Sequence, residues 1–243
     1  MLQFKINKID AIGSTNLALR DAFKKDQLKH GHVLWALNQI QGKGQRGAVW
    51  SVEANKNLTF SVFLSSEKVA FSSPNMLNFC VSLALKKCLE IFDIPTVSIK
   101  WPNDMLSGNK KIGGILIENV YRGAQLNGII VGIGLNVNQE KFEDLPQASS
   151  MRLVSGREFN LEEVLKQFLN SFDSFIAGNI DEASLFEHYQ KALFSLNERR
   201  EFRTDNDSFF AKVNGVDWNG QLELKFDEGE VKTFTQKSLQ WVY

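Results

Sequence analysis

Hydrophobic residues recur at two different spacings along the first hundred residues of the chain. Every second residue is apolar in 2–6 and again in 57–64, which predicts strands with one buried face. The apolar run 33–37 predicts a further, buried strand. Between 77 and 92 the apolar residues are three or four positions apart, which predicts a helix with one side in the core. The Ser-Pro pair that begins at Ser73 is a typical start for this helix.

The next elements continue this alternation of strands and amphipathic helices. Residues 14–16, Ser-Thr-Asn, begin a helix that we expect to end near Gly31, and the hydroxyl of the Ser or the Thr is the candidate N-cap. Further strands are expected at 97–100, 112–120 and 126–133, and further helices at 161–176 and 181–192.

The pattern changes from about residue 197. Segments near 209–213, 221–226 and 231–234 are short and strand-like, and turns separate them. This pattern predicts a small all-β module of about 50 residues. We therefore expect two domains, 1–195 and 196–243.

Length and charge limit the classes of partner. The chain has 243 residues, of which 43% are hydrophobic, so it is long enough to bury a sizeable core. The 28 Lys and Arg residues equal the 28 Asp and Glu residues, and this balance disfavours nucleic acid as a partner. No apolar run approaches the roughly 20 residues that span a bilayer, and residues 1–10 lack the pattern of an export signal. We expect a cytoplasmic protein that does not bind membranes.

Cysteine and histidine give no sign of a metal centre. Cys80 and Cys88 lie on the apolar side of the predicted helix, which favours buried free thiols over a disulfide or a metal pair. The three histidines are too dispersed along the chain to suggest a metal site.

A basic, glycine-rich segment follows the strand at 33–37. Residues 42–47, Gly-Lys-Gly-Gln-Arg-Gly, match the dinucleotide fingerprint G-x-G-x-x-G. That fingerprint needs a helix after it, and here the next expected element is the strand at 57–64, so we reject it. A loop with two cations and free N–H groups suits an anion, although a solvated turn is an equal alternative for this segment taken alone.

A second motif lies at the end of the strand at 97–100. Lys100 is followed by Trp101 and then by Pro102, which prevents further strand pairing at that point. A lysine that protects a sheet edge from aggregation is the plain alternative. The crowding of Trp101, Asn103 and Asp104 into one turn favours a built pocket, in which an ammonium group suits a phosphate or a carboxylate.

In this order, the motifs resemble those of the biotin protein ligases, and the resemblance covers most of the chain. It rests on Ser14-Thr15-Asn16, on Gly42 to Gly47 with Gln39 before and Trp50 after, on Lys100 to Asp104, on Lys111 to Leu116, and on Gly132 to Asn136. Lys-Trp-Pro-Asn-Asp is rather specific alone, and all five stretches in order are highly specific.

The resemblance implies an α+β fold: a mixed β-sheet with packed helices, similar to the catalytic domain of class II aminoacyl-tRNA synthetases. It implies a small SH3-like β-barrel at the C-terminus. It also implies a ligase that joins biotin to AMP, with ATP and biotin as substrates and Mg²⁺ on the phosphates. The biotin then passes to a lysine on the biotin carboxyl carrier domain of a biotin-dependent carboxylase. We expect a monomer or a weak homodimer.

The resemblance also implies roles for individual residues. Biotin would contact Ser14, Thr15, Asn16, Gln39, Gly42, Lys100, Gly132 and Gly134. The nucleotide would contact Lys43, Gln45, Arg46, Trp50, Lys111 and Asn136. Lys100 and Arg46 are the expected catalytic residues, with Lys100 between the carboxylate and the phosphate, and no metal-ligating side chain is expected.

Two departures from the family pattern matter. Lys43 and Gln45 stand where better-known members often have arginine, so the charge facing the phosphates would come from Lys43, Arg46 and Lys100, which we expect to converge. The chain starts at the catalytic part, so we expect no winged-helix domain and no operator binding.

The alternatives to a biotin protein ligase are a lipoate or octanoate ligase on the same fold, and a binding protein without enzymatic activity.

Overall fold

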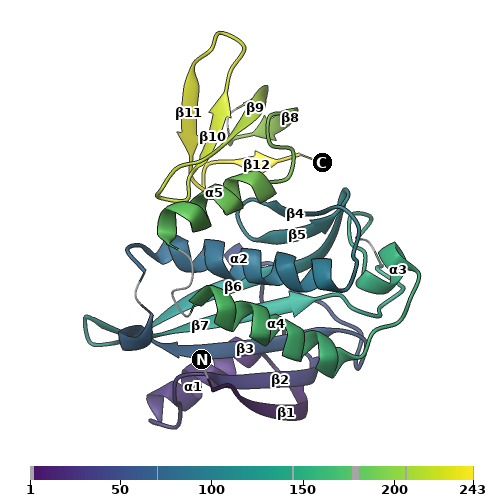
Figure 1. The fold of residues 1–243 in the computed structure, drawn as a ribbon, viewed down its shortest axis with the longest axis vertical. Helices are drawn as coiled ribbons and strands as arrows, with labels where there is room; N and C mark the ends of the chain where they lie inside the picture. The colour runs from purple at the N-terminus through teal and green to yellow at the C-terminus, as the bar shows by residue number, and fades with distance from the viewer. Residues whose placement is uncertain (1–2, 70, 144, 177–180, 206, 243) are drawn as a thin grey trace.

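The larger part of the molecule is a seven-stranded mixed β-sheet (Figure 1). The computed structural model describes residues 3–69, 71–143, 145–176, 181–205 and 207–242. The strand order is β1-β2-β3-β7-β6-β5-β4; β1 is parallel to β2, and all other neighbours are antiparallel. The strands are β1 (Lys5–Ile12), β2 (His32–Gln39), β3 (Leu58–Ser65), β4 (Val97–Lys100), β5 (Asp104–Ser107), β6 (Lys110–Arg122) and β7 (Gln125–Leu135). This sheet and its helices confirm the predicted α+β class.

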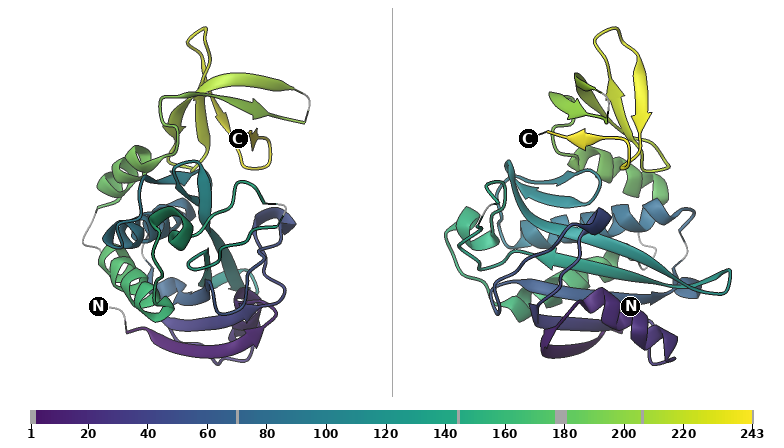
Figure 2. Two further views of the ribbon diagram at one scale, coloured as in Figure 1. Left: turned by 90° about the vertical axis from the view of Figure 1, so that its right-hand side faces the viewer. Right: turned by 180° about the vertical axis from the view of Figure 1, so that it is seen from behind.

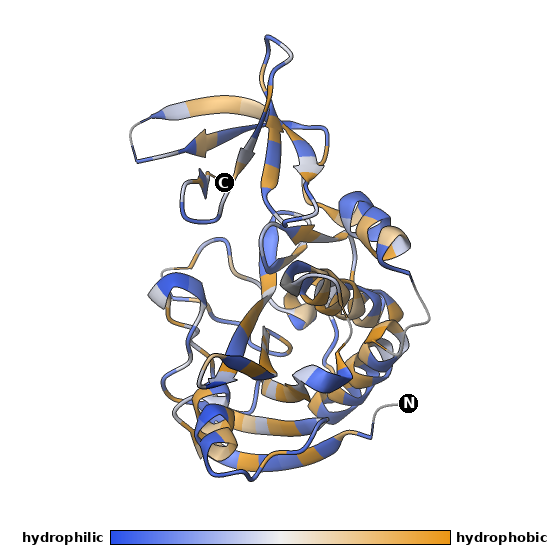
Figure 3. Ribbon diagram, turned by 90° about the vertical axis from the view of Figure 1, so that its left-hand side faces the viewer, coloured by the Kyte–Doolittle hydropathy of each residue, from blue (hydrophilic) through white to orange (hydrophobic). Residues whose placement is uncertain are grey.

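Helices cover both faces of the sheet. α2 (Pro74–Ile91) and α4 (Leu161–Ile176) lie on the face seen in Figure 1, and α1 (Thr15–Lys24) lies on the other face, seen from behind in Figure 2. Strand β3 shows the reason, because Phe60 and Val62 join the large core while Phe63 joins a smaller core with Leu19 of α1. Apolar and polar residues accordingly alternate along the outer strands in Figure 3.

A second, five-stranded antiparallel sheet forms the C-terminal module at the top of Figure 1. Its order is β11-β10-β9-β8-β12, and its strands are β8 (Arg199–Arg203), β9 (Ser208–Val216), β10 (Leu222–Lys225), β11 (Val231–Phe234) and β12 (Gln240–Trp241). The small C-terminal β module expected from the sequence is therefore present, and the division at 195/196 stays a prediction.

The C-terminal module is packed onto the rest of the molecule. α5 (Glu182–Ala192) carries Gln190, whose amide group donates to the carbonyl of Val216 (2.6 Å) and accepts from its N–H (3.0 Å). The indole N–H of Trp101 donates to the carbonyl of Gly220 (2.8 Å), so the turn after β4 is bonded directly to the module. Buried residues of β8, β9 and β10 belong to the same hydrophobic core as the seven-stranded sheet.

Several elements differ from expectation. The strand at 97–100 ends before Pro102 as predicted, but the chain then folds back into β5, and Asp104 pairs with Lys100. The sequence did not predict strands β5, β8 and β12, and it did not predict the short helix α3 (Met151–Ser155). The first helix ends at Lys24, well before Gly31. Within the described residues, no helix is both long and apolar enough to cross a lipid bilayer.

Candidate active site

Two compartments lie next to each other over the strand ends of the large sheet. The first has a volume of about 240 Å³ and is lined mainly by the start of α1, the loop after β2, and strands β6 and β7. The second, of about 360 Å³, is lined by Lys100, Asn136 and the segment 145–148 among others. Four residues line both compartments: Val49, Trp50, Asp104 and Lys111. The two compartments therefore meet around these residues.

Polar groups collect in the first compartment where α1 begins. Ser14 is the N-cap of α1, and its hydroxyl oxygen accepts from the N–H of Leu17. The N–H and the hydroxyl of Thr15 donate to Oε1 of Gln39, at 3.0 and 3.1 Å, and Gln39 comes from the end of β2. All three polar side chains are buried, so a ligand here meets a few fixed hydrogen-bonding groups in a small space.

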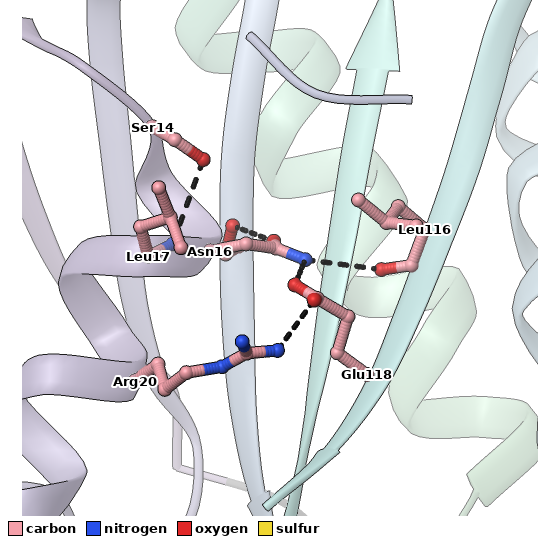
Figure 4. Close-up of polar contacts among 7 residues, drawn as sticks. Ser14, Asn16, Leu17, Arg20, Leu116 and Glu118 are labelled. Atoms are coloured by element: carbon pink, nitrogen blue, oxygen red, sulfur yellow. Dashed lines mark hydrogen bonds and ion pairs between the residues drawn. The ribbon is translucent and has the colours of Figure 1, made fainter. Parts of the chain in front are cut away.

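Asn16 is held by protein groups at both ends of its amide (Figure 4). Its Nδ2 donates to the carbonyl of Leu116 (3.3 Å) and to Oε2 of Glu118 (2.7 Å), and its Oδ1 accepts from Ser61 (2.6 Å). Glu118 in turn accepts from Arg20, one turn further along α1. Asn16 therefore lines the compartment as a fixed part of its wall.

The glycines of the site accommodate protein side chains. A Cβ built on Gly132 would lie 2.3 Å from Oδ1 of Asn16, and one on Gly134 would lie 2.3 Å from the Trp50 indole. Asn16 and Trp50 therefore occupy the space beside these two glycines of β7. The expected contacts of Gly132 and Gly134 with biotin stay a prediction. Both glycines still line the first compartment. A Cβ on Gly42 would lie 2.2 Å from the carbonyl oxygen of Trp50, so the two ends of the loop can approach this closely only with glycine at position 42.

Three lysines surround the junction, and they are not equivalent. Lys43 lines the first compartment, Lys100 lines the second, and Lys111 lines both. Nζ of Lys111 lies 2.6 Å from Oδ1 of Asp104 and 5.7 Å from the centre of the Trp50 ring. Lys111 is therefore the cation that the structure places where the compartments join.

Lys100 is buried, with 7% of its surface exposed. Its Nζ lies 5.8 Å from the ring centre of Trp241, which comes from β12 of the C-terminal module. Burial lowers the pKa of Lys100 to about 8; the carboxylate of Asp104 acts in the opposite direction, and Lys111 adds to the lowering. This lysine therefore changes from charged to neutral as the pH rises through about 8.

The other expected site residues are spread over the two compartments. Gln45 lines the first and Asn136 the second, where the Asn136 amide donates to the carbonyl of Ser149 (2.9 Å). Arg46 lines neither compartment; it is exposed in the loop, at the left-handed backbone angle φ 57°. The expected convergence of Lys43, Arg46 and Lys100 is thus not seen for Arg46 in this arrangement of the loop.

Sequence reasoning missed several contributors. Asp104 was visible in the motif after Lys100 and received no role, although it pairs with Lys111. Ser61, Glu118 and Trp241 carry no motif, because each reaches the site only through strand order or through packing of the C-terminal module. The segment 145–148, which lines the second compartment, has no signal in the sequence that we can identify.

Two known ligases are similar to this chain in sequence. The "Bifunctional ligase/repressor BirA" of Bacillus spizizenii is 28% identical over 236 residues, which cover 93% of this chain and 71% of that protein. The "Biotin--[acetyl-CoA-carboxylase] ligase" of Paracoccus denitrificans is 35% identical over 129 residues, which cover 50% of this chain and 53% of that protein.

Solved structures show the same fold. The biotin protein ligase of Aquifex aeolicus in complex with biotin and ATP superimposes with a TM-score of 0.79 at 24% identity, covering 98% of each chain. A family model described as "Biotin/lipoate A/B protein ligase family" matches residues 9–136, just over half of the sequence. This chain therefore belongs to the biotin/lipoate A/B protein ligase family.

Proposed function

We propose that this protein is a biotin protein ligase, which activates biotin with ATP and transfers it to a lysine of a carrier domain. The observation that carries the proposal is the pair of compartments that share Lys111 and Asp104. A reaction between two bound molecules needs such a junction, because the reacting atoms must be held about 3 to 3.5 Å apart.

The two compartments suit different parts of the substrates. The ureido ring of biotin has two N–H donors and one carbonyl acceptor, which match the hydroxyls and amide of Ser14, Thr15 and Gln39 in the first compartment. The second compartment, with Lys100 and Asn136, takes the nucleotide. The carboxylate end of biotin and the α-phosphate of ATP then meet beside Lys111.

In the first step, a carboxylate oxygen of biotin attacks the α-phosphorus of ATP, and the bond from that phosphorus to the bridging oxygen breaks. Biotinyl-5′-AMP forms and pyrophosphate leaves. Two unit charges 4 Å apart repel by about 4 kcal/mol at an effective dielectric constant of about 20, so cations are needed to bring the anions together. Lys111 lies at the junction for this role, and Lys100 and Lys43 lie on either side of it.

In the second step, the amine of a carrier lysine attacks the acyl carbon, the bond to the AMP oxygen breaks, and the amine nitrogen loses a proton. Water must be kept from the mixed anhydride until then. The loop of residues 42–50 is placed to do so, because Lys43, Gln45 and Trp50 line the first compartment. Its glycines allow it to close over a ligand.

Mg²⁺ fits the site as a companion of ATP. The described residues include no cluster of three or more His, Cys, Asp or Glu that would hold a metal ion. Mg²⁺ usually keeps several waters and binds substrate phosphates with one or two carboxylates. The ion would therefore arrive on the phosphates, and Asp104 is the carboxylate that lines both compartments.

The partner that we propose is a biotin carboxyl carrier domain. The Paracoccus relative is named as a ligase of acetyl-CoA carboxylase. A monomer or weak homodimer, the cytoplasm as its location, and the lack of binding to DNA remain predictions from the sequence.

The test is ATP–pyrophosphate exchange with labelled pyrophosphate. We expect exchange that requires biotin, and a fall of at least about 100-fold in Lys111→Met, since the loss of one group that stabilises charge in a transition state costs about 3 kcal/mol. Lys166→Met is the matched control, because Lys166 lies on the surface of α4 in a pair with Glu162.

The same assay decides between the candidate functions. Exchange that requires lipoate or octanoate in place of biotin would show that the protein is a lipoate or octanoate ligase. Biotin binding without exchange, measured by calorimetry, would show a binding protein without enzymatic activity.

A further inference from the structure

A continuous series of hydrogen bonds runs from the ion pair of Arg20 and Glu118 to the wall of the first compartment (Figure 4). It passes through the amide of Asn16 and the hydroxyl of Ser61 to the hydroxyl of Thr15. Glu118 does not line the compartment itself, and about a quarter of its side chain (26%) is exposed. Its hydrogen bond to Asn16 is what connects Glu118 to the compartment.

Glu118 determines which way the Asn16 amide points. The two acceptors on one side of that amide are the carboxylate of Glu118 at 2.7 Å and the carbonyl of Leu116 at 3.3 Å. Only the NH₂ group can face two acceptors, because the carboxamide oxygen has no proton to donate and would be repelled by both. The oxygen of Asn16 must then face Ser61.

This orientation determines the hydroxyl protons that follow. Ser61 lies 2.6 Å from Oδ1 of Asn16 and 2.7 Å from Oγ1 of Thr15, but it has one proton for two neighbours. Oδ1 of Asn16 can only accept, so the Ser61 proton goes to Asn16. The Thr15 proton then goes to Ser61 or to Oε1 of Gln39 at 3.1 Å. In both cases a protein group takes the Thr15 proton, and the Thr15 oxygen keeps a lone pair for a ligand.

We propose that Glu118 is a positioning residue that makes the Thr15 oxygen a hydrogen-bond acceptor for a ureido N–H of the substrate. The proposal rests on the proposed function, since it assigns that N–H to biotin. Gln39 completes the pattern: its Oε1 is occupied by Thr15, which leaves its NH₂ group as a donor for a carbonyl. If the Asn16 amide turned around, Ser61 would donate its proton to Thr15, and the Thr15 proton would then be free to point at the ligand. Thr15 would no longer be fixed as an acceptor.

Glu118→Gln tests the proposal, because glutamine keeps the shape but offers an NH₂ group as well as an oxygen, so it no longer fixes the Asn16 amide. We expect the KM for biotin to rise about tenfold or more, as for a lost hydrogen bond in a charged network, with kcat and the KM for ATP within about threefold. Glu162→Gln is the matched control, since that carboxylate pairs with Lys166 on the surface of α4. An unchanged biotin KM in Glu118→Gln overturns the proposal.

Two further measurements separate this role from a general structural one. In a Ser61→Ala background the path to Thr15 is broken, so adding Glu118→Gln should raise the biotin KM by less than about twofold. A full, additive effect overturns the proposal.

The second measurement compares two biotin analogues, each with one ureido N–H replaced by CH₂. The wild type should discriminate at least about tenfold against one of them, and Glu118→Gln should lose most of that discrimination. Equal discrimination by the wild type and by Glu118→Gln contradicts the proposal.

Arg20→Gln provides a second variant if Glu118→Gln does not fold. Arg20 is more than one-third exposed, so we expect the protein to fold with glutamine in its place, and the change removes the ion pair of Glu118. We expect a rise of about threefold in the biotin KM, and no rise overturns the proposal. A wild type without biotin-dependent exchange would instead refute the proposed function, so the two failures are distinguishable.

Discussion

Lys100 is a buried cation whose pKa of about 8 lies more than two units below that of a free lysine. Below about pH 8 the side chain carries its charge, and as the pH rises through 8 it loses the proton. We predict that kcat/KM for ATP falls above about pH 8, since this ratio reports the ionisation of the free enzyme. Lys100→Arg should abolish the fall, because arginine stays charged. A wild-type profile that is flat between pH 7 and 9.5 would remove Lys100 from nucleotide binding.

The sequence identified the residue types of the site better than their roles. Ser14, Thr15 and Gln39 could be identified because they stand within motifs, and they do line one compartment together. Asn16 stands in the same motif, yet its amide bonds Ser61 and Glu118, which are remote in the chain. Whether a side chain faces a ligand or another side chain depends on such distant neighbours, which no local pattern contains.

At the scale of the element, β7 is shaped by the side chains that cross it. Gly132→Ala would bring a Cβ within 2.3 Å of Asn16, which Glu118 and Ser61 hold in place, whereas Gly134→Ala would meet the ring of Trp50 on the loop. We predict that Gly132→Ala lowers the free energy of unfolding by about 1–3 kcal/mol, as overpacking does, and weakens biotin binding. Gly134→Ala should lower it less. Chemical denaturation measures both, and a larger loss for Gly134→Ala would contradict this account of the two contacts.

The loop after β2 is a narrow turn, since the N–H of Gly44 donates to the carbonyl of Ala48 (2.7 Å) and the N–H of Trp50 donates to the carbonyl of Gly42 (3.0 Å). The segment between them, residues 45–47, is largely exposed. We predict that amide hydrogen exchange of residues 43–47 slows when biotin and ATP are added together, because the loop closes over them. The amides of β9 serve as an internal control. Unchanged exchange in 43–47 would argue against a closing loop.

Elements with a strong hydrophobic period were predictable, and elements defined by their neighbours were not. Strand β3 and helices α2 and α4 have buried faces that repeat at the spacing of their own structure. Strand β5, Asp-Met-Leu-Ser, and strand β8, Arg-Arg-Glu-Phe-Arg, are short, and β8 is highly charged. They are strands because β4, β6 and β9 supply partners for their backbone groups.

At the scale of the whole molecule, the C-terminal module contributes to the site. Trp241 lies over Lys100, and Gly220 accepts from Trp101 next to that lysine. We predict that Trp241→Ala raises the KM for ATP by about 3- to 30-fold, as for the loss of a partly desolvated cation–π contact, whereas Trp241→Phe keeps most of the affinity. Steady-state kinetics at pH 7 tests this. Equal KM values for Trp241→Ala and the wild type would mean that the module does not act through Lys100.

For the molecule as a whole, we propose that one continuous site brings the carboxylate of biotin to the α-phosphate of ATP beside Lys111. The most direct measurement is to incubate the purified protein with biotin and ATP labelled at the α-phosphate, without any carrier domain, and to separate the products. We predict labelled biotinyl-5′-AMP in the wild type and at least about 100-fold less in Lys111→Met. Label that appears on an acyl-adenylate only when lipoate or octanoate replaces biotin, or wild-type yields from Lys111→Met, would contradict the account.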